Sequence, residues 1–268
     1  MTTENLQATG PGSLRKFENY RSRFLPTARD LIVYVPGPYE WNPALRFPVL
    51  YLQDGQNIFD PATSFGGVAW GVGETADRLI AEGSIRPLII VGIYNTGKSR
   101  LREYTPSRAP KLGGGGANRY GRMLLEEIKP FIESQYRTLA GPANTGLGGS
   151  SLGGLLTIYL GLRFPKVFGR LAVLSPSVWW NQRWIINYAA GLRLPSRPRI
   201  WLDTGTQEGA HTAGDARKLR DVLVRQGWQQ GRDLEYEEIQ GGQHNEAAWA
   251  QRVAPFLQFL FPSGEAEV

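Results

Sequence analysis

The chain has 268 residues, no Cys, two His, 30 basic and 24 acidic side chains, and a net charge of +6. The absence of Cys excludes thiol nucleophiles, disulfides, iron–sulfur clusters and Cys-rich zinc sites, and two His cannot form a three-His metal site. No metal site is therefore expected, and the chain is long enough to bury a sizeable core in one domain.

The positive charge is scattered along the chain. One of the denser stretches, Lys98–Arg102, holds three basic residues, and such spacing fits a solvated basic surface better than a nucleic-acid groove. The first residues lack a basic segment followed by an apolar one, and no apolar run approaches the ~20 residues of a membrane helix. We therefore expect a cytoplasmic protein with no nucleic-acid or membrane partner.

From about residue 30, short apolar runs alternate with helical patterns, which is typical of a mostly parallel sheet with helices on both faces. One domain is expected over residues 14–261, between poorly ordered polar tails at 1–13 and 262–268. The predicted strands are Leu31–Val35, Pro48–Leu52, Leu88–Ile93, Thr145–Gly148, Arg170–Leu174, Ile200–Asp203 and Leu234–Ile239. The predicted helices are Gly73–Glu82, Arg119–Tyr136 with a bend near Pro130, Leu152–Phe164, Asp215–Gln226 and Asn245–Phe261.

Three segments give further expectations. Leu152–Phe164 is apolar on every side, which predicts a buried helix. The loop Lys111–Ala117 contains the unbroken run Gly113–Gly116 and is expected to be flexible and near a mouth of the fold. After Arg170–Leu174 the chain makes only a short excursion around Trp184, so we expect an exposed cleft without a large lid.

Gly149-Ser150-Ser151-Leu152-Gly153 matches the pattern G-x-S-x-G between a predicted strand and the predicted buried helix. In a nucleophile elbow the Ser occupies a strained strand-to-helix turn, so small residues must stand two positions away on either side. A glycine-rich turn with an incidental Ser is the alternative. The strand, the helix and the downstream partners favour Ser151 as a nucleophile.

A Ser hydroxyl needs a base to remove its proton, and in this arrangement the order along the chain is Ser, acid, His. His244 follows the strand Leu234–Ile239 in a tight loop and precedes the last predicted helix. His211 is the alternative base, but no strand immediately precedes it. The order of the residues therefore favours His244.

Two carboxylates follow one another in Ile200-Trp201-Leu202-Asp203-Thr204-Gly205-Thr206-Gln207-Glu208. Glu208 lies in the loop beyond the strand, where a carboxylate can turn toward an imidazole N–H, so we favour it as the orienting acid. Asp203, inside or at the end of the strand, is expected to be a buried carboxylate bonded to backbone amides of that loop. Asp215 is interpreted as a helix N-cap.

Acyl transfer also requires two backbone N–H donors for the developing oxyanion. Leu152 follows the nucleophile and is the first candidate. Gln56 is the second, because Gln53-Asp54-Gly55-Gln56-Asn57 ends an early strand with a sharp turn. An ordinary Asp-Gly turn is the alternative interpretation of this loop.

Taken together, these stretches resemble the esterase family of the α/β-hydrolase superfamily, which includes enterochelin-type siderophore esterases, feruloyl and acetyl-xylan esterases, S-formylglutathione hydrolase and mycolyltransferases. The resemblance runs from about residue 30 to residue 260 and includes FPVLYLQDGQNIFD, REYTPSR, LGGSSLGGL, LSPSVWW, DTGTQEG and GGQHNEAAW. It implies an α/β-hydrolase fold, with Ser151 as nucleophile, His244 as base and Glu208 as acid. It also implies that the amides of Gln56 and Leu152 are the oxyanion donors.

The resemblance also implies residues that bind the substrate. Arg102 lies in a segment similar to one from which siderophore esterases direct an Arg toward their anionic substrate, although an Arg–Glu pair within the loop is an equal alternative. Trp70 and Trp179 are expected near the nucleophile, as an aromatic wall for an acyl or aryl group. Trp180 is expected in the core.

The leading hypothesis is a serine carboxylic-ester hydrolase for small acyl or aryl esters that works through an acyl-enzyme and needs no cofactor. Acyl transfer to a sugar hydroxyl would use the same residues, and a catalytically silent carbohydrate- or glycoprotein-binding relative is the alternative from another class. An intact set of Ser, His and acid argues against the silent relative. The expected partner is a small-molecule ester, and the sequence leaves open whether the chain forms a homo-oligomer.

Overall fold

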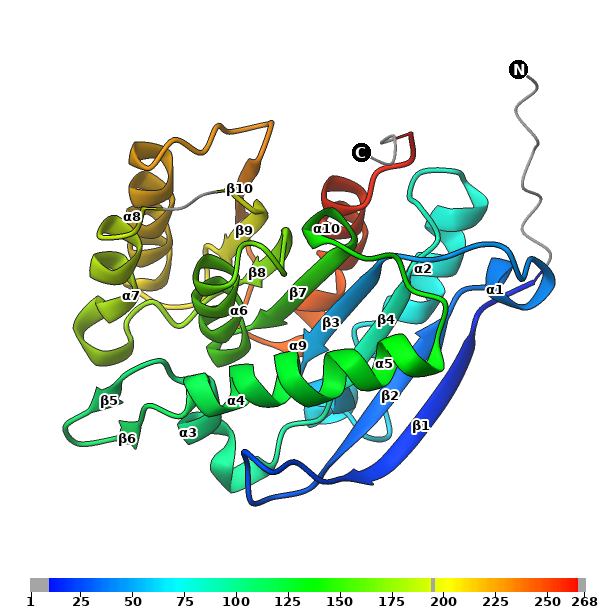
Figure 1. The fold of residues 1–268 in the computed structure, drawn as a ribbon. Helices are drawn as coiled ribbons and strands as arrows, with labels where there is room; N and C mark the ends of the chain where they lie inside the picture. Colours follow the sequence, from blue (N-terminus) through cyan, green and yellow to red (C-terminus); the bar gives the residue numbers. More distant parts are fainter. Residues whose placement is uncertain (1–9, 194–195, 265–268) are drawn as a thin grey trace.

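The computed structural model describes residues 10–193 and 196–264 (Figure 1). Its centre is an eight-stranded sheet in the order β1-β2-β4-β3-β7-β8-β9-β10. The pairs β1–β2 and β2–β4 are antiparallel, and every other pair in this sheet is parallel. The strands are β1 (Ser13–Tyr20), β2 (Arg29–Val35), β3 (Val49–Gln53), β4 (Ile89–Ile93), β7 (Thr145–Ser150), β8 (Arg170–Leu174), β9 (Arg199–Gly205) and β10 (Leu234–Ile239).

Helices cover both faces of this sheet, as the alternating pattern predicts (Figure 1). One apolar layer packs under α2 (Val72–Ala81), α9 (Glu246–Ala250) and α10 (Val253–Leu260). The other packs under α3 (Arg100–Tyr104), α4 (Ala117–Met123), α5 (Lys129–Gln135), α6 (Leu152–Arg163), α7 (Trp180–Ala190) and α8 (Thr212–Arg225). A short helix, α1 (Pro38–Trp41), follows β2. Helix α6 is buried along nearly its whole length, which confirms the prediction for this segment.

Two predicted helices are interrupted next to a proline. Before Pro130 the chain forms a π-helical segment, Leu124–Ile128, between α4 and α5. The predicted helix 245–261 divides into α9 and α10, and Pro255 lies in the first turn of α10. Proline has no N–H to donate and clashes with the carbonyl four residues earlier, so a continuous α-helix is disfavoured at both places.

Other segments differ from expectation. Within the predicted loop Lys111–Ala117, Gly113–Gly114 forms the short strand β6, which pairs with β5 (Arg108–Ala109). A Cβ on Gly114 would lie 2.6 Å from the Trp180 ring, so this close approach requires glycine. Asp215 is not an N-cap, because α8 already begins at Thr212.

Parts of the predicted tails are structured. The Gly12 amide donates a hydrogen bond to Asp77, Ser13 already belongs to β1, and Pro262 forms a bridge with Ile85. The remaining tail residues, 1–9 and 265–268, lie outside the described residues. Within the described parts of the chain, no helix is both long and apolar enough to cross a membrane.

The parallel strands bring the predicted site together. β7 lies between β3 and β8, and β9 and β10 continue the sheet on the β8 side. The segments that follow β3, β7, β8, β9 and β10 therefore all leave the sheet at its carboxyl edge, where ligand sites form in open α/β sheets.

Candidate active site

Ser151 sits in the turn between β7 and α6, with φ 57° and ψ −120°. A non-glycine residue in this conformation is strained, and such strain is typical of functional turns. The turn also leaves no room for side chains beside it. A Cβ on Gly149 would lie 2.9 Å from the Gln53 Cβ atom, and a Cβ on Gly154 would lie 2.8 Å from the Leu174 carbonyl oxygen. Gly149 of the motif and Gly154 just after it therefore allow the elbow to form.

Three predicted side chains meet above this turn. His244 Nε2 lies 2.9 Å from Ser151 Oγ, and His244 Nδ1 lies 3.1 Å from Glu208 Oε2. His244 lies in the loop between β10 and α9. The Trp249 ring packs edge-on against its imidazole, with the two ring centroids 4.9 Å apart. These contacts suit a neutral imidazole that donates from Nδ1 to the carboxylate and accepts the Ser hydroxyl proton at Nε2.

Glu208 is held by more than the imidazole. Its Oε1 atom accepts hydrogen bonds from Ser175 Oγ at 2.5 Å, from the Gly205 amide at 2.7 Å and from Arg252 Nη2 at 3.0 Å. Burial alone would raise the pKa of the Glu208 carboxyl. Its hydrogen bonds, of which the one with His244 has the largest effect, outweigh burial and hold the pKa below its ordinary value.

Asp203 occupies a separate place inside β9 and is fully buried. It accepts hydrogen bonds from Trp201 Nε1 at 2.8 Å, from Arg252 Nη1 at 2.8 Å and from the Ser175 amide at 3.2 Å. The expected amides of its own loop are not among these donors. Burial raises the pKa of Asp203 even though Arg252 opposes the shift. Of the two candidate carboxylates, Glu208 is the one in contact with His244.

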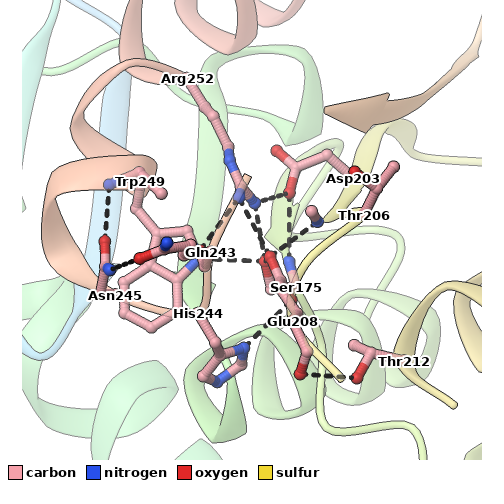
Figure 2. A network of polar contacts seen from close by, with 12 residues as sticks. Ser175, Asp203, Thr206, Glu208, Thr212, Gln243, His244, Asn245, Trp249 and Arg252 are labelled. Carbon is pink, nitrogen blue, oxygen red and sulfur yellow. Dashed lines mark hydrogen bonds and ion pairs between the residues drawn. The ribbon is translucent and has the colours of Figure 1, made fainter. Parts of the chain in front are cut away.

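Arg252 and Ser175, to which no sequence motif pointed, connect the two carboxylates (Figure 2). Arg252 is 1% exposed, and its Nη1 atom also donates to Ser175 Oγ at 2.7 Å. Ser175 follows β8 with φ 41°, and its hydroxyl also accepts a hydrogen bond from Trp249 Nε1. A lone Arg within the predicted helix 245–261 is the sequence signal that could have identified Arg252.

The predicted oxyanion donors come from the elbow itself and from the turn after β3. Leu152 is the first residue of α6, so its amide has no partner within the helix. Gln56 lies in the turn Gly55–Asn57 after β3 and borders the same cleft as Ser151. A Cβ on Gly55 would lie 2.5 Å from the Gly92 carbonyl carbon, which explains the glycine in this turn.

A cleft of about 650 Å³ opens beside Ser151 and His244. One polar group in it is an ion pair, in which Arg100 Nε and Nη2 donate to the two oxygens of Asp54, each at 2.7 Å. Asn95 donates to the same carboxylate at 2.7 Å. A further charged side chain of the lining is that of Glu246, at the start of α9.

Glu246 is 8% exposed and accepts hydrogen bonds from Asn57 Nδ2 at 2.9 Å and from Trp70 Nε1. Burial raises the pKa of Glu246 to about 7. The Trp70 hydrogen bond lowers this pKa, and the negative charge of Asp54 raises it. Glu246 therefore changes charge near neutral pH within the cleft that Ser151 borders.

The predicted substrate residues lie elsewhere. Arg102 is exposed outside the cleft, and Arg100, two residues earlier on α3, faces it. Trp70 is 3% exposed, and its Nε1 atom donates a hydrogen bond to Glu246. Trp179 is 51% exposed and borders a separate depression next to His211. Trp180 is 1% exposed, in the core as predicted.

Neither a metal nor a cofactor is suggested by the side chains of this site. Across residues 10–193 and 196–264, no group of three or more His, Asp and Glu side chains is arranged to hold a metal ion.

Residues 22–260 match the model of a protein family described as "Putative esterase". The chain belongs to this esterase family. It is 27% identical over 220 residues to the ferri-bacillibactin esterase BesA of Bacillus subtilis, covering 73% of each chain. It is 30% identical over 151 residues to an endo-1,4-beta-xylanase/feruloyl esterase of Xylanibacter ruminicola, and this match covers 56% of the chain but 19% of that relative.

A crystal structure of the BES protein from Bacillus cereus has the same fold. It superimposes with a TM-score of 0.72 at 22% identity, covering 97% of this chain and 99% of that one. The α/β-hydrolase fold and the esterase family expected from the sequence are both confirmed.

Proposed function

We propose that this esterase hydrolyses small acyl or aryl carboxylic esters through a covalent acyl-enzyme on Ser151. The proposal rests on one observation, the continuous contact from Ser151 Oγ to His244 Nε2 at 2.9 Å and from His244 Nδ1 to Glu208 at 3.1 Å. A nucleophile, a base and an orienting carboxylate within hydrogen-bond reach are what acyl transfer requires. Family membership supports ester hydrolysis as the overall reaction.

The proposed reaction has two halves. Ser151 Oγ attacks the ester carbonyl carbon while its proton passes to His244 Nε2, and the amides of Gln56 and Leu152 stabilise the oxyanion. The ester C–O bond then breaks, and the imidazolium returns the proton to the departing alkoxide. In the second half, water attacks the acyl carbon, His244 takes the proton from that water, and Ser151 Oγ leaves with the proton that His244 returns. Glu208 stabilises the imidazolium in both halves.

The test is a series of p-nitrophenyl esters from acetate to octanoate, assayed with the parent protein and with Ser151→Ala and His244→Ala. We expect each substitution to lower kcat by about 10⁴-fold or more, because the members of such a set act as a unit. His211→Ala is the matched control, since His211 is exposed beside the separate depression, and it should retain nearly full activity. Equal activity in the parent and Ser151→Ala, or a parent inactive on every ester, would contradict the proposal.

A further inference from the structure

An exposed apolar segment borders the same cleft as the charged groups. Phe65 is 80% exposed and Val68 is 41% exposed, and both line the cleft that contains Ser151 and His244. We call residues Phe65–Val68 the apolar lip. Large apolar side chains gathered at a concave surface commonly mark a binding site. Phe65 is not part of the buried core, so packing does not explain why an aromatic side chain occupies this position.

The backbone of the apolar lip is held in place although the side chain of Phe65 is free. Asn57 Oδ1 accepts the Phe65 amide at 3.0 Å, and the Asn57 carbonyl accepts the Trp70 amide at 2.9 Å. Ser64 Oγ donates to the Val68 carbonyl at 2.5 Å, which closes the loop on itself. A fixed backbone presents the Phe65 ring at a defined position, and this lowers the entropy cost of binding against it.

The same Asn57 side chain connects the apolar lip to the polar side of the cleft, because its Nδ2 atom donates to Glu246. The only cation among the residues that line this cleft in the described chain, Arg100, already forms a two-point ion pair with Asp54. Glu246 adds a second carboxyl group. The charged groups of the cleft therefore do not favour the binding of a negatively charged substrate.

From this arrangement we infer that the apolar lip is a substrate subsite, with Phe65 as its main contact, for an uncharged aromatic ring or alkyl chain of the ester. The inference rests on the proposed function and specifies its substrate class. A ring or chain placed against Phe65 would remove apolar surface of both partners from water, which stabilises the complex.

The experiment compares Phe65→Ser and Phe65→Leu with the parent on two ester series. One series varies the acyl group on p-nitrophenol, from acetate through butyrate to octanoate. The other varies the alcohol of acetate esters, from ethyl to 2-naphthyl. Leu14→Ser is the matched control, because Leu14 is 52% exposed at the start of the edge strand β1, away from the carboxyl edge of the sheet.

We expect Phe65→Ser to lower kcat/KM about tenfold for the largest ester of at least one series and less than twofold for ethyl acetate. Phe65→Leu should keep most of the activity on large esters, and Leu14→Ser should match the parent throughout. A loss that grows with acyl length places the acyl group against Phe65, and a loss that grows from ethyl to 2-naphthyl acetate places the alcohol there. An equal loss on every ester, or no loss on any, would overturn the subsite.

Charge is tested with a matched pair of similar chain length, p-nitrophenyl butyrate and mono-p-nitrophenyl succinate. The uncharged butyrate should have the higher kcat/KM in the parent, and a preference for the succinate would overturn the inference of an uncharged ligand. Failure of the subsite is distinguishable from failure of the proposed function. If Ser151→Ala abolishes hydrolysis while Phe65→Ser behaves as the parent on all esters, only the subsite is wrong.

Discussion

Two clusters of charged side chains lie near His244, and they differ in their access to water. The buried cluster consists of Ser175, Asp203, Glu208 and Arg252, and the side chains of its three charged members are at most 1% exposed. The cleft cluster consists of Asp54, Arg100 and Glu246, and the Arg100 side chain is 26% exposed. In the buried cluster Arg252 forms ion pairs with two carboxylates, those of Asp203 and Glu208. In the cleft cluster Arg100 forms an ion pair with one carboxylate, that of Asp54.

Burial alone does not determine the charge of the carboxyl groups in these two clusters. Glu208 accepts hydrogen bonds from a cation, a hydroxyl and a backbone amide as well as from His244, and its pKa is lowered. Glu246 accepts hydrogen bonds from two neutral groups, and its pKa rises to about 7. The buried cluster is thus suited to keep Glu208 ionised and fixed, and the cleft cluster to respond to what enters the cleft.

The largest effect is expected from Glu208→Gln, which removes the charge in contact with His244. We expect kcat on p-nitrophenyl butyrate to fall about 10³-fold or more, because an amide neither fixes the imidazole tautomer nor stabilises the imidazolium. Asp203→Asn should lower kcat by less than about tenfold, since Asp203 does not contact His244. A larger loss of kcat in folded Asp203→Asn than in Glu208→Gln would assign the acid to Asp203.

Arg252→Met tests whether one guanidinium neutralises the buried cluster. It leaves the carboxylates of Asp203 and Glu208 buried without their cation, and we expect the free energy of unfolding in urea to fall by about 3–5 kcal/mol. Adding Asp203→Asn should restore part of this loss, because one of the two unpaired charges is removed. Unchanged stability in Arg252→Met would contradict this account of the cluster.

Glu246→Gln tests the cleft cluster through pH. The pKa of Glu246 is raised from 4.5 to about 7 in the folded protein, so the folded state binds the proton more tightly than the unfolded state. Stability therefore falls as pH rises from 4.5 to 7, and this residue accounts for about 3 kcal/mol of that fall. Urea unfolding at pH 5 and pH 7 should show a smaller difference in Glu246→Gln than in the parent. An equal difference would mean that Glu246 titrates normally.

The parts of the fold that the sequence predicted are those in which burial determines composition. Strands β2, β3, β4 and β8 are rich in Val, Ile and Leu, and the seven strands predicted from the sequence lie close to where they were expected. The edge strand β1 was missed, because its SLRKFENY sequence is mostly exposed and carries charges, as edge strands do. Helix α7 was missed as well, and its residues 181–183 have positive φ, which helix propensity does not predict.

The same division applies to the site. The positions of Ser151, Glu208 and His244 could be proposed because each lies in a short segment after a strand, and all these segments meet at one edge of the sheet. Arg102 was misplaced because residues two apart on a helix point to different sides. The role of Arg252 could not be assigned, because its partners Ser175, Asp203 and Glu208 lie 44 to 77 residues earlier in the chain.

The smallest effect is expected from Arg100→Lys in the cleft cluster, and Arg252→Lys is the same change in the buried cluster. A lysine at position 100 keeps the charge beside Asp54 but loses the two-point contact, and water in the cleft can replace the lost hydrogen bond, so stability should fall by about 1 kcal/mol or less. At position 252 the single Nζ atom of a lysine cannot occupy both the Nη1 position, which contacts Ser175 and Asp203, and the Nη2 position, which contacts Glu208. Water does not reach this cluster to replace the lost contact. We therefore expect urea unfolding to show a several-fold larger loss for Arg252→Lys, accompanied by a fall in kcat that Arg100→Lys lacks. Equal losses for the two variants would mean that access to water does not distinguish the clusters.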